Sequence, residues 1–286
     1  MADTATRIGI ADKRRAFRRL HDSGLFVIPN PWDVGSARML QGLGFKALAS
    51  TSSGYAWSRG HPDNHITLEM SLAHLRELVD ATDVPINADF ENGFAHDPAG
   101  VARHVRQAVD TGVAGLSIED ATGDAAQPLY PAADAVERVR AARRAIDESG
   151  ADVMLVGRAE GFLHPQPNLD DVLSRLRAYA DAGADCLYAP GLRTREQVAA
   201  VVAAVAPRPV NVLVSAPGGF TVADLQSMGV RRISVGGALA RAAWAGFLRA
   251  ARMLAKEGSF EGFADSASGL ELNDFFAADL AARRTP

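Results

Sequence analysis

Short apolar runs recur at intervals of about thirty residues along the chain, with polar and small residues between them. Each run has the length of a buried strand, and there are about eight of them, the number that closes a barrel. The runs lie at residues 25–29, 47–50, 84–89, 115–119, 153–157, 186–189, 210–214 and 232–235. This rhythm predicts strands that alternate with longer connecting segments.

The connecting segments have apolar residues at helical spacing. Leu72, Leu75, Leu78 and Val79 illustrate the pattern, which gives a crossover helix one apolar face. Several of these segments end in a glycine that can take the left-handed conformation after a helix, at positions 44, 112, 150, 183 and 229. Because strands joined by helices pair in parallel, we predict a (β/α)8 TIM-type barrel with an extra C-terminal helical segment. An open doubly wound sheet is the alternative, but no break in the rhythm marks a reversal of strand order.

The end of the chain has a different pattern. We expect a barrel domain at 1–257, closed by a long helix over 240–256, and a helical tail at 258–286. The tail has four phenylalanines, at positions 260, 263, 275 and 276. Exposed on a monomer they would be a liability, so the tail is predicted to pack on the barrel or on a neighbouring subunit of a homo-oligomer.

Composition narrows the class of protein. The 286 residues have a formal net charge of -4, which argues against a nucleic-acid or anionic-membrane partner and favours a small-molecule substrate. No segment has the apolar length of a signal peptide or a membrane helix, so we expect a cytoplasmic protein. The single cysteine, Cys186, excludes an internal disulfide and lies in a predicted strand, where we expect an inert core thiol.

Carboxylates gather where two neighbouring strands end. Asp89 and Glu91 follow the third predicted strand, and Glu119 ends the fourth. Chemistry in a barrel lies at the C-terminal ends of the strands, and residues two apart in extended backbone point to the same side. Three oxygen ligands without His or Cys favour magnesium or manganese over zinc. The alternative is that these residues cap helices and pair with nearby arginines.

Three further segments are candidates for binding substrate or metal at the same rim. Arg158, at the end of the fifth strand, can grip a carboxylate or phosphoryl oxygen, or pair with Glu119 or Glu160, and both roles can coexist. The run of small hydroxyl residues at 50–55 can present backbone N–H groups to an anion. Asp63 can approach a metal through water.

A rival interpretation rests on the glycines after the last two strands. Residues 215–219 and 235–238 lie where many barrels bind phosphate at a helix N-terminus. A sugar-phosphate isomerase or synthase could be built in this way. It would leave the acidic cluster unexplained.

Taken together, these residues resemble the isocitrate lyase/phosphoenolpyruvate mutase superfamily from about Phe26 to the C-terminal tail. The matching stretches are PNPWDVGSA at 29–37, SSGY at 52–55, GHPD at 60–63, ADFENGF at 88–94, SIED at 117–120 and GRAE at 157–160.

The resemblance implies a barrel, magnesium and a tetramer that exchanges its last helix between neighbouring subunits. It implies that Asp89 meets the magnesium most directly, while Glu91, Glu119 and Asp63 hold it through water. It further implies that Ser53, Gly54 and Tyr55 receive the substrate carboxylate and that Arg158 holds the other substrate oxygens.

The chain departs from the family pattern after the fourth strand. The lyases of isocitrate and methylisocitrate have a Lys-Cys-Gly-His type of loop there, and the mutase and phosphonopyruvate hydrolase have a lysine-rich loop. This chain has ATGDAAQPL at 121–129, with neither Lys nor Cys. The departure argues against isocitrate and methylisocitrate cleavage and disfavours the mutase reaction.

We therefore predict a magnesium-dependent lyase that cleaves a C–C bond next to the carbonyl of a small, oxaloacetate-like 2-oxo acid through an enolate. The predicted catalytic residues are Arg158, Glu119 and Thr122, and the loop around 122–127 is expected to close as a lid. Two alternatives stay open, namely C–P bond chemistry of the mutase type and a non-catalytic protein that binds 2-oxo acids.

Overall fold

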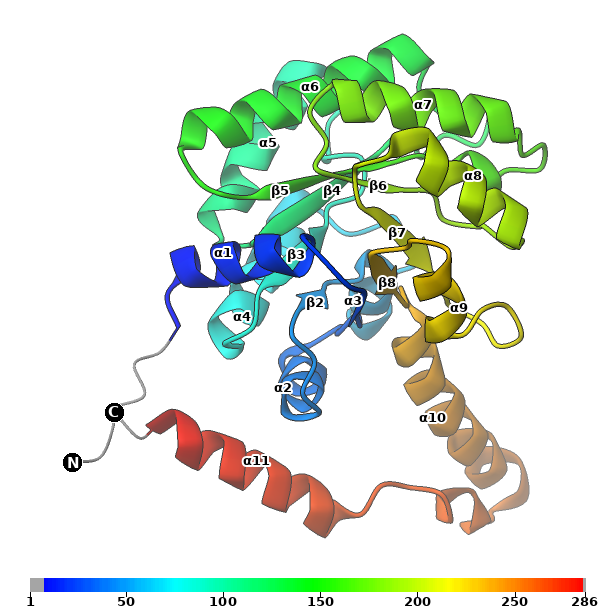
Figure 1. The fold of residues 1–286 in the computed structure, drawn as a ribbon. Coiled ribbons are helices and arrows are strands. Elements are labelled where there is room, and N and C mark those ends of the chain that lie inside the picture. Colours follow the sequence, from blue (N-terminus) through cyan, green and yellow to red (C-terminus); the bar gives the residue numbers. More distant parts are fainter. Residues whose placement is uncertain (1–7, 285–286) are drawn as a thin grey trace.

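The computed structural model of the chain describes residues 8–284 and contains all eight predicted strands (Figure 1). The strands are β1 (Phe26–Ile28), β2 (Leu48–Ala49), β3 (Ile86–Asp89), β4 (Gly115–Glu119), β5 (Met154–Arg158), β6 (Cys186–Tyr188), β7 (Val210–Leu213) and β8 (Arg232–Ser234). The α-helices are α1 (Ile10–Leu20), α2 (Val34–Gly42), α3 (Ser52–Ser58), α4 (Leu68–Ala81), α5 (Pro98–Asp110), α6 (Ala132–Ser149), α7 (Leu169–Asp181), α8 (Arg195–Val205), α9 (Val222–Ser227), α10 (Ala238–Glu257) and α11 (Gly269–Arg284). Two short 3-10 helices, η1 (Gly161–Leu163) and η2 (Glu261–Phe263), follow β5 and α10.

All paired strands are parallel, in the order β1-β8-β7-β6-β5-β4-β3-β2. The first strand therefore pairs with the last, which an open doubly wound sheet would not allow. At the remaining seam, the Ala49 N–H donates to the Pro29 carbonyl at 3.1 Å. The barrel prediction is confirmed, and β2 is the short strand at which the ring is least regular.

Asn30 joins the three strand ends at this seam. Its side-chain amide donates to the Ser50 carbonyl at 3.0 Å, and its Oδ1 accepts from the N–H groups of Val235 and Gly236 at 2.9 and 2.8 Å. One buried amide thus links the ends of β1, β2 and β8, which satisfies backbone groups that the short strands leave unpaired.

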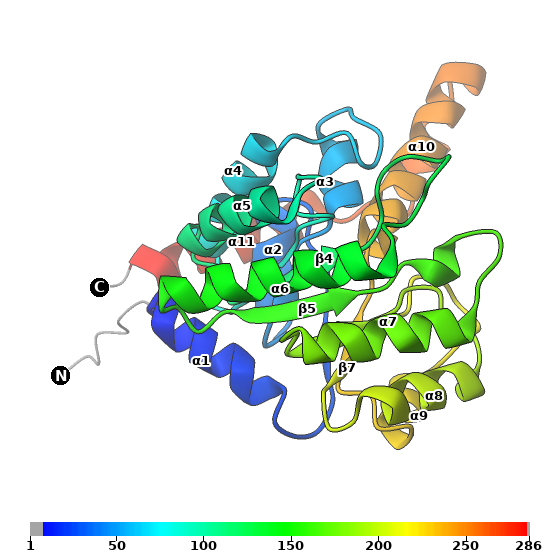
Figure 2. The same cartoon turned by 90° about the horizontal axis from the view of Figure 1, so that it is seen from above.

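The helices cover the outside of the strands (Figures 1 and 2), and the main apolar core lies between the two layers. A second cluster closes the N-terminal end of the barrel, where Phe17 of α1 packs with Ala47, Ala114 and Met154. The apolar stripe predicted for residues 72–79 is buried on α4. The chemistry is therefore left to the opposite, C-terminal end.

Local sequence signals explain where the helices begin and end. Side-chain oxygens cap seven helix N-termini, at Asp33, Thr51, Thr67, Asp97, Asn168, Thr194 and Thr221. The five predicted stop glycines all have positive φ, between 68° and 103°. Glycine at these positions lets the chain reverse into the next strand without a steric penalty.

The interior of the barrel is unusually polar. Asn87, Ser117, Asn211, Arg232 and Ser234 are all less than 9% exposed and lie on β3, β4, β7 and β8. Branched apolar side chains usually fill this space in barrels of this class. The polar groups therefore need partners inside the barrel, and they make the interior continuous in character with the rim.

The C-terminal helices extend away from the barrel (Figures 1 and 2). Of the twenty residues of α10, only Ala240 is buried. Helix α11 returns to α2, where Asp279 pairs with Arg38 at 3.1 Å and the Phe275 ring lies over Gly42, at which a Cβ atom would come within 2.4 Å of the ring. The tail thus packs on the barrel through α11, while α10 stays largely uncovered.

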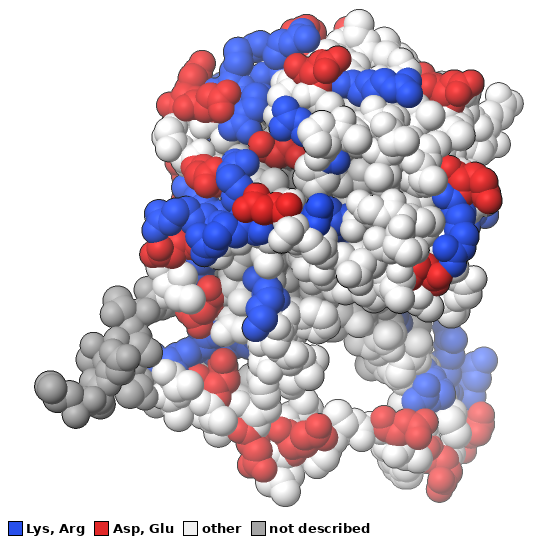
Figure 3. Space-filling view, in the orientation of Figure 1, with Lys and Arg blue, Asp and Glu red and all other residues white. Residues whose placement is uncertain are grey.

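On the face drawn in Figure 3, basic and acidic side chains are interspersed. Within residues 8–284, no helix combines the length and apolar character needed to cross a membrane. Cys186 is fully buried, as expected of a core thiol.

A buried ionic cluster fixes the end of β4 to α7. The Asp120 carboxylate is 2% exposed and accepts from the Tyr179 hydroxyl at 2.7 Å, from Arg175 at 3.1 Å and from the Glu160 N–H at 2.8 Å. These contacts orient the chain immediately after both β4 and β5. The cluster is therefore a support for the rim.

Replacing Asp120 with alanine should remove the partner of a buried arginine, and we expect a loss of about 3–5 kcal/mol in the free energy of unfolding. Urea unfolding followed by circular dichroism measures this loss. Asp181→Ala, on the exposed end of α7, is the control and should change stability by about 0.5 kcal/mol or less. Equal effects for the two variants would contradict the supporting role of Asp120.

Candidate active site

A cavity of about 160 Å³ opens at the C-terminal ends of the strands. Polar side chains from all eight strands or the segments after them line it. They are Asn30, Ser50, Thr51, Ser52, Ser53, Asp63, Asn87, Asp89, Ser117, Arg158, Tyr188, Asn211, Arg232 and Ser234. Its position and its size suit a small polar molecule.

Arg158 lies at the centre of the acidic cluster. One guanidinium nitrogen, Nη1, is 3.1 Å from Asp89 Oδ1 and 3.0 Å from Glu119 Oε2. The Nε atom donates to Glu160, and the guanidinium lies 5.1 Å from the centre of the Tyr188 ring. Burial opposes the charge, but the carboxylates of Glu119 and Glu160 outweigh it and raise the pKa of Arg158. A pairing with Glu119 or Glu160 was predicted, and the structure shows Arg158 paired with both, while the guanidinium still lines the cavity.

Asp89 is positioned from both sides. Its Oδ2 atom accepts from the Ser52 N–H at 3.0 Å and from the Ser52 hydroxyl at 2.9 Å, while its own N–H donates to the Ser50 hydroxyl at 2.9 Å. The hydroxyl residues predicted to bind an anion therefore hold this carboxylate in place. The orientation leaves Asp89 on the wall of the cavity.

Glu91 is a strained and incompletely satisfied residue. Its φ of 46° is in the left-handed region, which is costly for a residue with a Cβ atom. Its Oε1 atom is buried without a hydrogen-bond partner among the described residues. Burial, together with the charges of Asp89 and Asp63, raises the pKa of Glu91 to about 8. A positive charge beside this side chain would therefore stabilise its ionised form.

Burial also shifts the pKa values of the neighbouring residues Glu119 and Glu160. Burial raises the pKa of Glu119 well above its ordinary value, although the Arg158 charge opposes the shift. Burial also raises the pKa of Glu160, against the pull of Arg158. A single guanidinium thus does not neutralise all the carboxylates at this rim.

Asp63 reaches the rim from the exposed segment between α3 and α4. Its carboxylate lines the cavity and accepts from the Asn64 N–H at 3.0 Å. Partial desolvation and the charge of Asp89 raise the pKa of Asp63. The structure thus brings together all four acidic residues predicted to hold a metal.

The predicted carboxylate-binding segment forms the first turns of α3. Ser53 lines the cavity, and its hydroxyl is 3.1 Å from that of Thr51. The Gly54 N–H donates to the Thr51 hydroxyl, and the Tyr55 N–H donates to the Thr51 carbonyl. The Tyr55 ring stacks on His74 with 3.9 Å between ring centres. Of these three residues, Ser53 has its side chain at the cavity, and the substrate-binding roles of Gly54 and Tyr55 stay predictions.

Thr122 lies in a loop that is held by hydrogen bonds between its own residues. Its hydroxyl donates to the Gln127 carbonyl at 2.5 Å, and its N–H donates to the Pro128 carbonyl at 3.0 Å. The side chain does not line the cavity in this arrangement. The structure therefore does not bring Thr122 together with Arg158 and Glu119, and its catalytic role stays a prediction.

The donor set suits a hard divalent cation. Asp89, Glu91, Glu119 and Asp63 offer oxygen atoms only, and the buried Oε1 of Glu91 has no partner among the described residues. Within residues 8–284 no three acidic, histidine or cysteine side chains are already arranged as ligands, and Nη1 of Arg158 contacts both Asp89 and Glu119. The chemistry of these residues thus fits the predicted metal.

The polar residues inside the barrel were not predicted from the sequence. Asn87, Ser117, Asn211, Arg232 and Ser234 line the lower part of the cavity. Their signal was a polar residue in the middle of an apolar run, at the alternate positions of a strand that share one face. They show that the cavity continues below the acidic rim.

Part of the rival phosphate site, the segment after β8, already has an internal acceptor. The N–H groups of Val235 and Gly236 both donate to Asn30, so two of the groups that a phosphate would use have an internal acceptor. This arrangement favours the acidic rim as the reactive centre.

Comparisons with known proteins identify similar sequences and structures. A family model described as phosphoenolpyruvate phosphomutase matches residues 17–255. The oxaloacetate decarboxylase of Rhodopseudomonas palustris (strain BisB5) is 31% identical over 235 residues, which cover 79% of this chain and 78% of that protein. A structure from Burkholderia cenocepacia J2315, provisionally described as a lyase/mutase, is 47% identical with a TM-score of 0.90, covering 94% of this chain and 97% of that one. Oxaloacetate acetylhydrolase with its product oxalate is 28% identical with a TM-score of 0.84, covering 96% of each chain.

The raised pKa of Glu91 predicts how the metal-free protein responds to pH. The folded state holds the Glu91 proton up to about pH 8, whereas the unfolded state releases it near the ordinary value of 4.5. Stability from this group is therefore full below about pH 4.5 and is lost as the pH rises toward 8. We expect the melting temperature without added metal to fall by several degrees over this range.

Glu91→Gln, which cannot ionise, should flatten this fall, and Glu257→Gln on the exposed end of α10 should leave it unchanged. Differential scanning calorimetry at several pH values measures both. The same slope in Glu91→Gln and in the unmodified chain would show that Glu91 is not the group responsible.

Proposed function

The chain belongs to the phosphoenolpyruvate phosphomutase family, within the isocitrate lyase/phosphoenolpyruvate mutase superfamily of lyases and mutases. On this basis we propose that it cleaves a C–C bond next to the carbonyl of a small 2-oxo acid. An oxaloacetate-like dicarboxylate is the proposed substrate. The observation that carries the proposal is the Arg158 guanidinium on the cavity wall, surrounded by carboxylates that it does not fully neutralise. Relatives named for reactions of oxaloacetate support the choice of substrate.

In this proposal the side chains of the rim bind and orient the substrate. Arg158 holds substrate oxygens with its forked donors, and the contacts with Glu119 and Glu160 keep the guanidinium in place. The Ser53 hydroxyl, in the first turn of α3, takes part in binding the substrate carboxylate. Fixed donors of this kind stabilise the charge that develops on the carbonyl oxygen as the bond breaks.

Magnesium is the proposed cofactor, with manganese as a substitute. Asp89 would hold it most directly, with Glu91, Glu119 and Asp63 as the further oxygen donors. When bound, the cation supplies positive charge that polarises the carbonyl group. The raised pKa values of Glu91 and Glu119 support this assignment, because they show that these carboxylates are not fully neutralised.

For a decarboxylation, the electrons of the broken C–C bond stay on the carbon next to the carbonyl, and carbon dioxide leaves. The resulting enolate then takes up one proton to give the keto product. The loop at 121–129 has neither Lys nor Cys, so the proton would come from another donor or from water. The closure of this loop over the cavity, which would bring Thr122 to the substrate, is part of the proposal.

Phosphonate chemistry is the second candidate, because the matching family model is that of a phosphomutase. The substrate would then be phosphonopyruvate-like, and the same rim would stabilise the same enolate. The sequence of the 121–129 loop counts against it. A protein that only binds 2-oxo acids is the remaining alternative.

We expect turnover of oxaloacetate that requires added magnesium, and Asp89→Asn should lower kcat/KM by at least about 100-fold, because the variant loses a charge at the reacting centre. Coupled assays for pyruvate and for phosphate, on a panel of oxaloacetate and phosphonopyruvate, separate C–C from C–P cleavage. Asp170→Asn, on the exposed start of α7, is the control and should keep full activity. Turnover that survives in Asp89→Asn would refute the metal role, and calorimetric binding without turnover would favour the binding protein.

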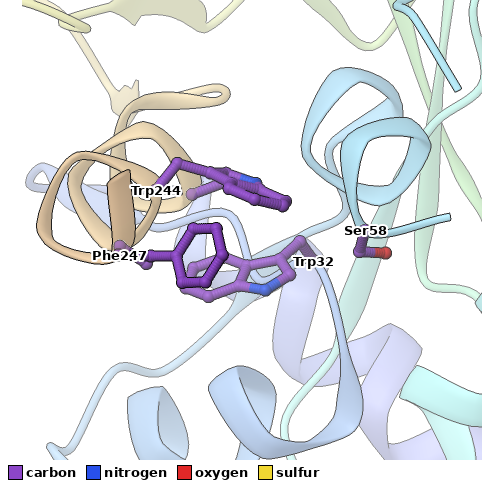
Figure 4. Close-up of a pocket in the computed structure, with 6 residues that line it drawn as sticks. Trp32, Ser58, Trp244 and Phe247 are labelled. Atoms are coloured by element: carbon purple, nitrogen blue, oxygen red, sulfur yellow. The ribbon is translucent and has the colours of Figure 1, made fainter. Parts of the chain in front are cut away.

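A homotetramer is proposed as the assembled form. Trp244 and Phe247 of α10 face Trp32 and Ser58 around an open pocket of about 250 Å³ (Figure 4). Phe247 is 60% exposed, and a second apolar cavity of about 380 Å³ lies further along the same helix, next to Phe263. Apolar surface of this kind is typical of subunit interfaces. The C-terminal helices of a neighbouring subunit would cover it.

Trp244→Glu combined with Phe247→Glu should dissociate this assembly, because two charges would be buried at the interface. Size-exclusion chromatography with light scattering should give four times the 30.2 kDa chain mass for the unmodified protein and a smaller species for the variant. Arg252→Glu, a charge change on the same helix, is a weaker perturbation and serves as the control. A monomeric unmodified protein would contradict the proposed tetramer.

A further inference from the structure

The barrel contains a buried positive charge without a counter-ion. Arg232, the first residue of β8, is 3% exposed, and its Nε and Nη1 atoms donate to the side-chain oxygens of Asn211 at 2.8 Å and Asn87 at 3.3 Å. Both acceptors are neutral amides. In the part of the chain that the structure describes, no carboxylate forms an ion pair with this guanidinium.

Two other buried arginines have carboxylate partners, whereas a third, Arg138, has neutral acceptors and lies away from the cavity. Arg158 pairs with three carboxylates, and Arg175 pairs with Asp120 and Asp171. Arg138 lies outside the cavity and donates to two backbone carbonyls while it covers the Tyr130 ring at 3.9 Å. A buried charge without an opposite charge is costly. Arg232 lines the cavity, so an anion that enters from the rim can reach it.

We infer that Arg232 is the centre of an anion-binding subsite at the floor of the cavity, which receives the second carboxylate of a dicarboxylate ligand. The identity of that ligand rests on the proposed function, whereas the positive floor does not. The Asn211 amide donates to the Ser234 hydroxyl at 2.9 Å, and this hydroxyl also hydrogen-bonds to Tyr188, so the groups around the guanidinium are neutral. The subsite therefore combines one forked cation with neutral hydrogen-bonding groups.

The depth of the subsite suits a short dicarboxylate. Asn87 precedes Asp89 by two residues on β3, so the floor lies about 7 Å below the rim. That separation is comparable with the end-to-end length of a four-carbon dicarboxylate. One end of such a ligand would lie at Arg158 while the other reached Arg232.

The distribution of charge selects for two carboxylates over one. The rim contains more negative than positive side chains around Arg158, whereas the floor contains Arg232 and neutral amides and hydroxyls. A monocarboxylate bound at the rim would leave the floor charge uncompensated. A dicarboxylate would neutralise it through two parallel hydrogen bonds.

The test uses L-malate and L-lactate, which share a 2-hydroxy acid head and differ by the second carboxylate. Isothermal titration calorimetry at constant magnesium concentration should show that the unmodified protein binds malate at least about 30-fold more tightly than lactate. Arg232→Met should abolish this preference by weakening malate and leave the affinity for lactate within a factor of about two. Arg231→Met removes the same charge from the neighbouring residue, which donates to the Gly24 carbonyl, and should keep the preference.

Several results would overturn the subsite. They are equal binding of malate and lactate by the unmodified protein, an unchanged preference in Arg232→Met, or an equal loss of affinity for both ligands in that variant. Should Arg232→Met fail to fold, a crystal structure of the unmodified protein with malate decides the matter. A carboxylate at hydrogen-bond distance from Arg232 supports the subsite, and malate held at the rim alone refutes it. A preference for malate that depends on Arg232, in a protein without 2-oxo acid turnover, would sustain the subsite and reject the proposed lyase.

Discussion

The rim of this barrel depends on one guanidinium held among carboxylates in a buried place. Arg158 Nη1 touches both Asp89 and Glu119, and Nε donates to Glu160. Without that positive charge the carboxylates would repel one another, and burial would drive them to the protonated form. With it, the cluster persists but is not neutral, as the raised pKa of Glu91 shows. An incompletely neutralised acidic rim supports the proposed binding of a cation and an anionic substrate.

The scaffold around this pair is arranged to hold it. Serine groups at the start of α3 fix Asp89, the Asp120 cluster fixes the residues after β4 and β5, and the Asn30 side chain joins the strand ends at the seam. Each contact satisfies a buried polar group and also sets the direction of a rim side chain. The left-handed backbone of Glu91 belongs to the same pattern, because such strain persists only where the surroundings hold it.

Much of the site was predictable from the order of residues, and the reasons are physical. Parallel strands bring their C-terminal ends to one rim, so Asp89, Glu91, Glu119 and Arg158 could be placed together before any contact was known. Asp63 lies in a loop, so its approach to the metal through water was proposed from its position, and the family resemblance made its role specific. The roles of Gly54 and Tyr55 were less predictable, because they depend on whether the backbone N–H groups of these residues are free. A helix begins at this point, and its N-cap residue Thr51 accepts from the Gly54 N–H. Thr122 lies in a loop whose internal hydrogen bonds no spacing rule foretells.

The sequence by itself determined the alternation of strands and helices, the glycine-terminated crossovers and the acidic rim, because these depend on periodicity and on local backbone preference. Tertiary structure alone decided the closure of β1 on β8, the sharing of Arg158 among three carboxylates and the return of α11 to α2. It also decided that Arg232 lies unpaired by any described carboxylate beneath the rim. Each of these features depends on which residues far apart in the chain become neighbours. The cost and the role of a buried charge are set by the groups that surround it in the folded protein.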